Sequence, residues 1–161
     1  PALTAAADFS LEMVRNGNQR KERTENVKFL GADGLRMPFH DNCFQAAVTG
    51  FSVRNVIDID AFVREMARVV VPGGKVVILE ITPLKNRAFA PLFRFYFHRI
   101  VPLIGTLISG EREAYTYLPQ SVDVFVAAEE LKERMGQNGL EDVDFKRLNL
   151  GTVALHWGTV T

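Results

Sequence analysis

The sequence predicts an α/β fold with a mainly parallel sheet, and the observations behind this lie in residues 37–83. A short apolar run at 46–50 is followed by a loop, a helical pattern, a Pro-Gly-Gly turn and a second apolar run at 76–81. A strand, a helix and a strand joined in this way form a right-handed crossover, and a continuous apolar run suits a strand buried on both faces. Ligands of such sheets bind at the carboxyl ends of the strands, so we expect functional residues at 50–55 and 80–83.

The helix inside this unit is indicated by its cap and its spacing. Asp58 is expected to be the N-cap, and Pro72-Gly73-Gly74 is expected to end the helix and turn the chain. The following strand, 76–81, carries one acid, Glu80, near its carboxyl end. The apolar residues of the helix fall at i, i+3, i+4, i+7 spacing: Ile59, Phe62, Val63, Met66, Val69 and Val70.

Before this unit the sequence predicts a strand, a helix and another strand. Residues 1–7 are small and apolar, so we predict the end of a strand there, followed by Asp8 and by Ser10 as a helix N-cap. The helix is expected to run to about residue 20, and residues 27–30 form the next strand. The inward residues of the helix are predicted to be Leu11, Met13 and Val14.

After this unit the sequence predicts a helix and an antiparallel hairpin. The helix at 127–138 is expected to end at Gly139 as the C′ residue. Residues 142–148 alternate polar and apolar side chains, and 152–157 follow after Asn-Leu-Gly, which indicates an antiparallel pair that closes the sheet. The inward residues of the helix are predicted to be Leu131 and Met135.

Composition limits the function classes. A chain of 161 residues fits one domain, 1–161, and 19 basic against 19 acidic side chains give no electrostatic argument for a nucleic-acid partner. The one cysteine, Cys43, excludes an internal disulfide, and the three histidines show no ligand spacing, so no metal is expected. No signal peptide is visible, and we expect a cytoplasmic protein.

An aromatic segment at 87–110 is long enough for a transmembrane helix, but its charges and prolines argue against one. Arg94, His98 and Arg99 lie in its middle. We interpret it as one or two helices with a broad apolar face. Two interpretations stay open: a buried core helix, or a hydrophobic lid or docking surface.

The sequence FSVRNVIDID (51–60) followed by REMARVVVPGGKVVILEITP (64–83) resembles the ubiquinone/menaquinone biosynthesis C-methyltransferase family. The family pattern is roughly FGLRNVxDxxxALxEMxRVLKPGGxLxxLEFSxP, and its Arg-Asn pair is more specific than the Pro-Gly-Gly turn. Further matches are ADFSLEM (7–13), GADGLRMPFHDNCFQ (31–45), IVPLIGTLISGEREAYTYLPQSV (100–122) and VALHWG (153–158). The resemblance implies a Rossmann-like class I methyltransferase sheet, S-adenosylmethionine as cofactor, and a prenylated hydroquinone or phenol as acceptor.

The resemblance also implies the cofactor residues. Asp8 matches the acid after the second strand, which commonly holds a ribose hydroxyl; the alternative is an acid that only supports the helix N-terminus. Asp33 matches the acid that accepts a hydrogen bond from the adenine amino group, and the backbone N–H of Gly34 would face adenine. Gly50 would line the cofactor, or else serve only a tight turn.

Five residues are candidates for the chemistry that the resemblance implies. Arg54 is the first candidate to stabilise a phenolate, and Asn55 would orient Arg54 or the substrate. His156 is the best general base by its ordinary pKa; the alternative is a histidine packed on an edge strand. Tyr115 and Tyr117 would orient the acceptor hydroxyl.

The family's first strand and its Gly-rich loop have no counterpart in this sequence. A sheet without that strand would have a gap or two exposed apolar edges. Three explanations are open: a longer protein as made, a strand from another chain, or a stable gapped domain. The edge argument favours the first.

The expected partners are a lipophilic small molecule, a membrane surface contacted peripherally, and a second copy of the chain. The helical lid at 87–118 would receive the isoprenoid tail. A dinucleotide-binding oxidoreductase is a rival function class, but nothing in this sequence resembles its fingerprint motif. A methyltransferase for another small apolar acceptor is a second rival, because Ser52 and Trp157 depart from the family pattern. A non-catalytic binding domain is the third alternative, for a chain that is truly this short.

Overall fold

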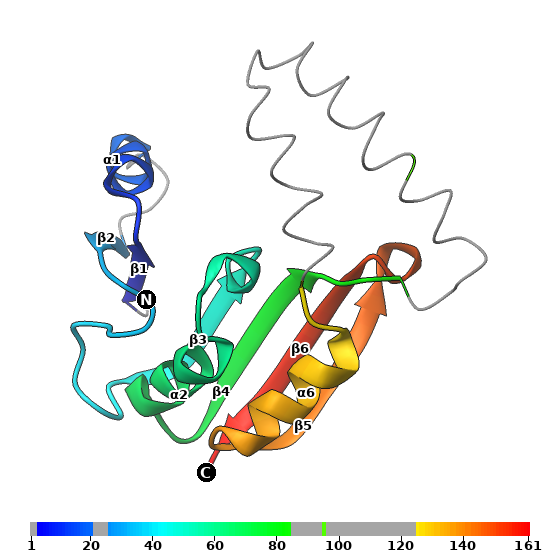
Figure 1. Ribbon diagram of the computed structural model, residues 1–161. Helices are drawn as coiled ribbons and strands as arrows, with labels where there is room; N and C mark the ends of the chain where they lie inside the picture. The colour runs from blue at the N-terminus through cyan, green and yellow to red at the C-terminus, as the bar shows by residue number, and fades with distance from the viewer. Residues whose placement is uncertain (1–2, 21–25, 85–94, 96–124) are drawn as a thin grey trace.

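The computed structural model describes residues 3–20, 26–84, 95 and 125–161. In these residues strands and helices follow one another in the order that the sequence predicts (Figure 1). The elements are β1 (Thr4–Asp8), α1 (Leu11–Gln19), β2 (Val27–Gly31), β3 (Phe44–Gly50), the 3-10 turn η2 (Val53–Asn55), α2 (Ile59–Val69), β4 (Val70–Ile81), α6 (Ala128–Gln137), β5 (Leu140–Leu148), the turn η4 (Asn149–Gly151) and β6 (Val153–Val160).

The strands form two separate sheets (Figure 1). β1 and β2 pair in parallel, with Asp8 opposite Gly31. The larger sheet has the order β3-β4-β6-β5; β3 and β4 are parallel, and β6 is antiparallel to both of its neighbours. The predicted α/β class and the C-terminal antiparallel hairpin are therefore confirmed. Among the described strands, β3 is an edge of the larger sheet and β1 pairs only with β2.

The β3-α2-β4 crossover is confirmed, with one difference at its Gly-Gly turn. Asp58 is the N-cap of α2, and its Oδ1 accepts a hydrogen bond from the backbone N–H of Ala61 at 2.9 Å. The helix was expected to include Val70 and to end at the Pro-Gly-Gly residues, which is wrong: α2 ends at Val69, and β4 starts at Val70. The register of β4 against β3 shifts over the Pro-Gly-Gly residues. A Cβ at Gly74 would lie 2.7 Å from the Gln45 carbonyl oxygen and 2.8 Å from that of Val71, so only glycine fits there.

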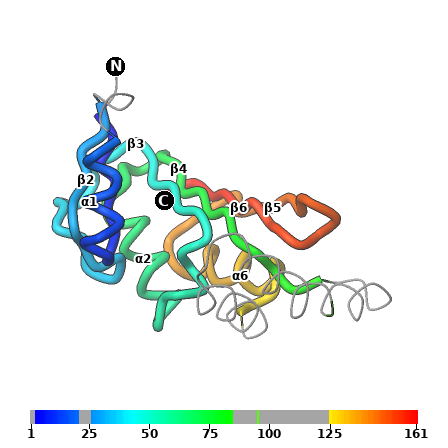
Figure 2. Tube along the Cα trace, turned by 90° about the horizontal axis from the view of Figure 1, so that it is seen from above, coloured from blue at the N-terminus to red at the C-terminus, as the bar shows by residue number. Residues whose placement is uncertain are grey.

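The hydrophobic core lies between the larger sheet and the two helices α2 and α6, which cover the same face of that sheet (Figure 2). The opposite face carries Val48, a residue that is 73% exposed. Leu131 and Met135 are fully buried, as predicted for α6, and Gly139 has the positive φ of a C′ residue, 92°. Other fully or nearly fully buried core residues are Val63, Met66, Val69, Val76 and Ile78.

The small N-terminal unit confirms one prediction and corrects another. Ser10 is the N-cap of α1, and its Oγ accepts a hydrogen bond from the Met13 N–H at 3.3 Å. Leu11 and Met13 were expected to be buried, which is wrong: they are 61% and 59% exposed, while Val14 is partly buried. The reason is the narrow two-stranded sheet under α1, which covers only part of the apolar stripe.

The connector between β2 and β3 is fixed to α2 by Arg68. The Arg68 guanidinium donates hydrogen bonds to the backbone carbonyls of Phe39 at 2.9 Å and Met37 at 3.2 Å, and it forms an ion pair with Glu65 at 2.7 Å. The connector ends at Cys43, an exposed residue at the amino end of β3. Arg68 therefore helps to hold the small sheet in place relative to the large one.

Candidate active site

The carboxyl ends of β3 and β4 lie side by side, because the two strands are parallel and Gly50 is opposite Leu79. Glu80, at the end of β4, is only 1% exposed, and its Oε1 lies 2.6 Å from Nη1 of Arg54 in the loop after β3. The Arg54 side chain is 11% exposed. The structure therefore places the predicted catalytic arginine in a buried ion pair at the edge where ligands of such sheets bind.

Glu80 makes further hydrogen bonds that fix the loop after β3. Its Oε2 accepts from the backbone N–H of Arg54 at 3.2 Å, and its Oε1 accepts from the N–H of Ile81 at 2.9 Å. Arg54 Nη1 also donates to the carbonyl of Phe51 at 2.7 Å. Both carboxylate oxygens are therefore used, and one acid links the arginine side chain, the arginine backbone and the strand end.

The loop itself has an unusual conformation. Phe51 adopts φ of 59°, in the left-handed region that non-glycine residues rarely occupy. Its N–H is bonded to the Leu79 carbonyl at 2.8 Å, and Val53 is fully buried in the core. Asn55 closes the 3-10 turn, with its N–H bonded to the Ser52 carbonyl at 3.0 Å. Backbone strain of this kind tends to occur at functional sites.

Two polar atoms at this edge are buried without a hydrogen-bond partner among the described residues: Nε of Arg54 and Oγ1 of Thr82. Thr82 follows Glu80 by two residues, is 2% exposed, and bonds its N–H to the Thr152 carbonyl at 2.9 Å. Buried polar atoms usually have partners. An unpartnered donor after β3 and an unpartnered hydroxyl after β4, both judged among the described residues, fit polar groups of a bound ligand.

The two acids expected to bind the cofactor lie at the carboxyl ends of the small sheet. Asp8 Oδ1 accepts from the N–H of Ser10 at 2.7 Å, and Asp33 Oδ1 accepts from the N–H of Leu35 at 2.9 Å. Both residues are exposed, and the Ala32 N–H bonds the Asp8 carbonyl at 3.0 Å. Each acid thus shapes its own turn, as the alternative for Asp8 proposes, and can still reach a ligand with its second oxygen.

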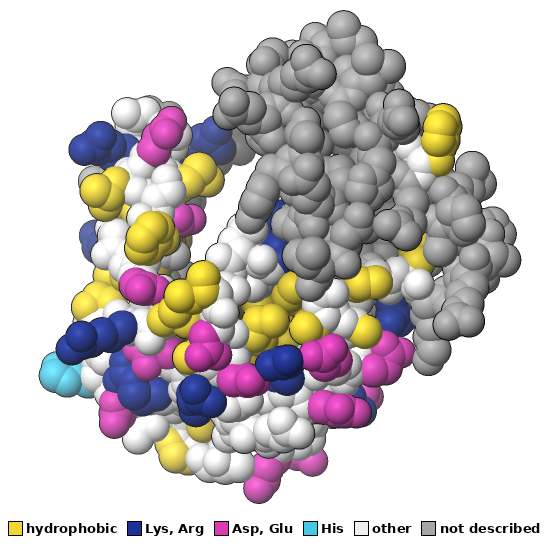
Figure 3. Space-filling model, viewed as in Figure 1, with side chains coloured by type: hydrophobic (Ala, Val, Ile, Leu, Met, Phe, Trp, Pro, Cys, Tyr) yellow, Lys and Arg dark blue, Asp and Glu magenta, His cyan; other side chains and the backbone are white. Residues whose placement is uncertain are grey.

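A hollow separates the part of the molecule that carries α1 and β1 from the part that carries β3 (Figure 3). Gly50, at the end of β3, has no atom within 4 Å of the position that a Cβ would take. Gly34 is different, because a Cβ there would lie 2.6 Å from the ring of Phe62. Packing therefore explains Gly34 by itself. The turn that follows Gly50 has its positive φ at Phe51, and both explanations of Gly50 stay predictions.

His156 lies on β6 beneath α6, and it is 1% exposed. Its Nε2 is 2.9 Å from the carbonyl oxygen of Ala128, and its ring stacks on Phe145 at 5.1 Å between centroids. Burial lowers the pKa of His156 below its ordinary 6.5, against the opposing effect of the Ala128 carbonyl. These contacts are those of a packed histidine, but the expected edge strand is wrong, because β6 lies between β4 and β5. The general-base role stays a prediction.

Tyr115 and Tyr117 lie outside the described residues, as does the expected lid at 87–118 apart from Phe95. Their roles stay predictions. In the part of the chain that the structure describes, no three His, Cys, Asp or Glu side chains gather as metal ligands would. No helix found there has both the length and the apolar character needed to cross a membrane.

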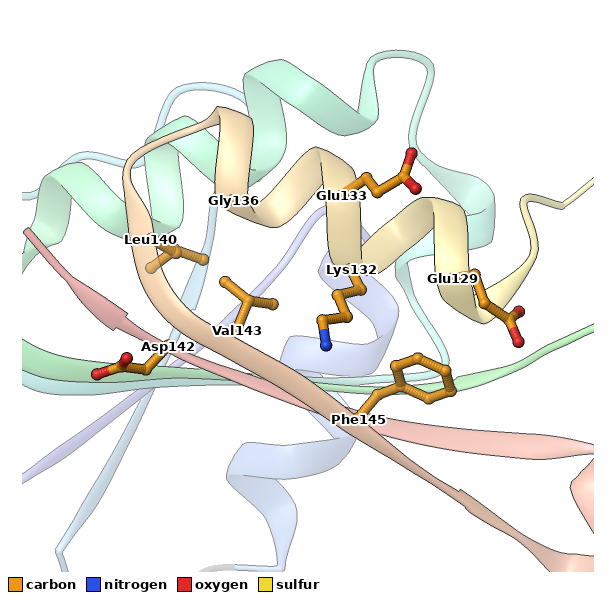
Figure 4. Close-up of a pocket in the computed structure, with 8 residues that line it drawn as sticks. All are labelled: Glu129, Lys132, Glu133, Gly136, Leu140, Asp142, Val143 and Phe145. Carbon is orange, nitrogen blue, oxygen red and sulfur yellow. The ribbon is translucent and has the colours of Figure 1, made fainter.

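A second hollow, of about 530 Å³, lies between α6 and β5, away from the acids at the strand ends (Figure 4). Lys132 points from α6 toward the strand that carries Phe145, and its Nζ pairs with the exposed Asp144 at 3.1 Å. This hollow offers no buried polar group to a ligand. Its lining residues are Glu129, Lys132, Glu133, Gly136, Leu140, Asp142, Val143 and Phe145.

Glu80 and Thr82 lie in the range 80–83 where functional residues were expected, but neither was given a role in the site. The sequence did carry a signal for Glu80, because a lone acid inside the apolar run VVILEI is unexpected on a buried strand. Thr82 gave no such signal. Its burial and its unpartnered hydroxyl are properties of the folded structure only.

The alternating strands and helices, the C-terminal antiparallel hairpin and the acids at the strand ends define the fold of class I methyltransferases. A solved SAM-dependent methyltransferase from Aquifex aeolicus superposes with a TM-score of 0.64 at 14% identity, over 99% of this chain and 69% of that one. At this identity the likeness shows the fold alone.

The chain belongs to the ubiE/COQ5 methyltransferase family, whose sequence profile matches residues 3–160. It is 40% identical over 158 residues to the demethylmenaquinone methyltransferase of Corynebacterium urealyticum, covering 98% of this chain and 66% of that protein. It is 36% identical to the ubiquinone/menaquinone biosynthesis C-methyltransferase UbiE of Rickettsia felis, covering 96% of this chain and 63% of that protein. The chain thus spans about two thirds of the length of these relatives.

Proposed function

We propose that this protein is a C-methyltransferase of quinone biosynthesis, which transfers a methyl group from S-adenosylmethionine to a ring carbon of a prenylated quinol or phenol. The observation that carries the proposal is the Arg54 guanidinium, held by buried Glu80 at the carboxyl ends of β3 and β4. The names of the family relatives support the same acceptor class.

The residues at the strand ends fit the methyl donor. Asp8 can accept hydrogen bonds from ribose hydroxyls, and Asp33 can accept one from an adenine amino group. When bound, S-adenosylmethionine would supply a methyl group on a positively charged sulfur. Gly34 would contribute its backbone N–H, while its lack of a side chain serves the packing of Phe62.

Arg54 would act on the acceptor. A ring carbon is a weak nucleophile until the neighbouring hydroxyl loses its proton and the phenolate charge spreads into the ring. A fixed guanidinium stabilises that charge as it develops, without reorganisation at the moment of reaction. The ring carbon gains the methyl group as the carbon–sulfur bond breaks, and the ring then loses its proton to a base. Thr82 would contribute a hydroxyl close to the same edge.

The lipophilic acceptor also makes a peripheral membrane contact part of the proposal. Its isoprenoid tail would be received by residues 87–118 at the cytoplasmic face of the membrane. A second copy of the chain as partner belongs to the same proposal. The membrane contact and the tail-binding role follow from the acceptor chemistry and the sequence, and liposome binding tests them. The second copy is a separate expectation, which the mass of the protein in solution tests.

The direct test uses the intact protein, S-adenosylmethionine carrying a ¹³C-methyl group, and a chemically reduced prenylated quinol. We expect one labelled methyl group on a ring carbon, observed by mass spectrometry and carbon NMR. The Arg54→Lys variant keeps the charge but loses the planar fork, so turnover should fall far more than cofactor affinity. Label on oxygen, or no transfer by the wild-type protein, would refute the proposal.

A further inference from the structure

A buried carboxylate at the end of a central strand needs an explanation beyond stability. Glu80 is 1% exposed and is part of an otherwise apolar strand end. Buried ion pairs repay their desolvation poorly, and apolar residues of the same volume are often as stable. The Glu80–Arg54 pair is therefore better explained by what it holds in place than by the stability that it adds.

The contacts of Glu80 restrain the side chain and the backbone of Arg54 together. Oε1 holds Nη1 at 2.6 Å, Oε2 holds the Arg54 backbone N–H at 3.2 Å, and the Ile81 N–H at 2.9 Å fixes the carboxylate to β4. A second anchor is the Phe51 carbonyl, 2.7 Å from Nη1. With Nη1 doubly bonded, the guanidinium plane cannot rotate freely, while Nε has no partner among the described residues.

We propose that Glu80 is a positioning residue: it fixes the Arg54 guanidinium so that the Nε edge is presented to the acceptor hydroxyl. This inference rests on the proposed function for the identity of the acceptor. Glu80 does not touch the reacting atoms. Its effect on the reaction passes entirely through the orientation of Arg54.

Charge alone predicts the opposite effect from positioning. The carboxylate partly neutralises Arg54, so its removal leaves a stronger net positive charge beside the developing phenolate. If charge decided the rate, Glu80→Gln would raise turnover. If orientation decides it, the variant lowers turnover, because a misplaced group loses its transition-state interaction.

The matched control is Glu65→Gln. Glu65 is also largely buried, with a side chain 12% exposed, and it likewise accepts from an arginine and from a backbone N–H, that of Met37 at 2.6 Å. It lies on α2, and its hydrogen bonds go to Arg68 and to Met37 rather than to Arg54. Its variant should lower the melting temperature and leave kcat at saturating cofactor within about twofold of wild type.

Turnover of the intact protein is measured for wild type, Glu80→Gln, Arg54→Lys and the double variant. We expect Glu80→Gln to lower kcat by about 10- to 100-fold with unchanged cofactor affinity. The double variant should be no more than about threefold slower than the slower single variant, because both changes remove one arrangement. Raised turnover, unchanged turnover, or losses that multiply in the double variant would overturn the proposal.

A second readout does not depend on methyl transfer. In ¹⁵N-arginine spectra of the intact protein, the two Nη groups of Arg54, assigned by their loss in Arg54→Lys, should be separately resolved in wild type and averaged in Glu80→Gln. Averaged Nη signals in wild type would refute the positioning role. If wild type shows the restrained signals and yet methylates no quinol, the positioning stands and the proposed function fails.

Discussion

The buried imidazole of His156 allows the packing explanation to be tested against the general-base explanation. Replacing His156 by Ala removes a ring that is 1% exposed and stacks on Phe145. Loss of a buried ring of this size costs about 2–4 kcal/mol. For a protein of this size each kcal/mol lowers the melting temperature by about 2–4 °C. We therefore expect a fall of roughly 5–15 °C.

The His156→Phe variant separates packing from titration. It keeps an aromatic ring against Phe145 and loses the 2.9 Å contact with the Ala128 carbonyl, a loss of about 0.5–1.5 kcal/mol at pH 8. The folded-state pKa of His156 is lowered by burial, with a smaller contribution in the same direction from Arg147 and an opposing one from Glu129. Below pH 6.5 the unfolded chain therefore takes up a proton that the native protein does not.

It follows that the wild-type protein loses stability as the pH falls below 6.5, by at most about 1.4 kcal/mol per pH unit, until the folded-state pKa is reached. The Phe variant lacks this loss, so the stability difference between the two proteins should narrow from pH 8 to pH 5. Urea unfolding of the intact protein, monitored by circular dichroism at each pH, measures this difference in the free energy of unfolding. A constant or widening difference would refute the packing argument, and a 10²- to 10⁴-fold loss of kcat in a stable Phe variant would establish the general base instead.

Four further predictions concern local features. Asp58→Ala removes the cap of α2 and should cost about 0.5–2 kcal/mol in chemical denaturation. Gly74→Ala forces a Cβ onto backbone carbonyls and should destabilise by about 1–3 kcal/mol, whereas Gly136→Ala, with no atom within 4 Å, should be neutral or stabilising by up to about 1 kcal/mol. Asp8→Ala should weaken cofactor binding by about 1–3 kcal/mol in calorimetry; unchanged affinity would exclude the ribose contact. The hydrogen bond from Arg68 lowers the pKa of Glu65 below 4.5. The ionised carboxylate therefore stabilises the fold above pH 4.5, and this stabilisation is lost as the pH falls through the folded-state pKa. Glu65→Gln should reduce the acid sensitivity of the melting temperature.

Local signals predicted much of the fold. The caps at Ser10 and Asp58 and the C′ glycine at Gly139 depend on residues within one helical turn, and all three are confirmed. The buried faces of the helices were harder to predict from the sequence. Leu11 and Met13 belong to an apolar stripe, but whether a stripe is covered depends on which distant elements pack against it, and in α1 both residues are exposed.

The candidate site, like the fold, has features that the sequence predicted and features that depend on contacts between distant residues. The position of Arg54 past a strand end followed from sequence order and from the family resemblance. Its pairing with Glu80 did not, because 26 residues separate them and only the β3–β4 register brings them together. The environment of His156 likewise depends on Ala128, 28 residues away on α6. The residues around His156 in the sequence cannot show that its ring lies under α6.

The exposed Cys43 has a practical consequence. It is the one thiol among these 161 residues and lies at the amino end of β3. The strand rises about 3.3 Å per residue, so the sulfur is separated from the Gly50 end by about 23 Å. A maleimide dye or a nitroxide can therefore be attached there without placing a bulky group among the site residues. Such a label would report, by fluorescence or electron spin resonance, whether ligand binding changes the environment or the mobility of the chain at the amino end of β3.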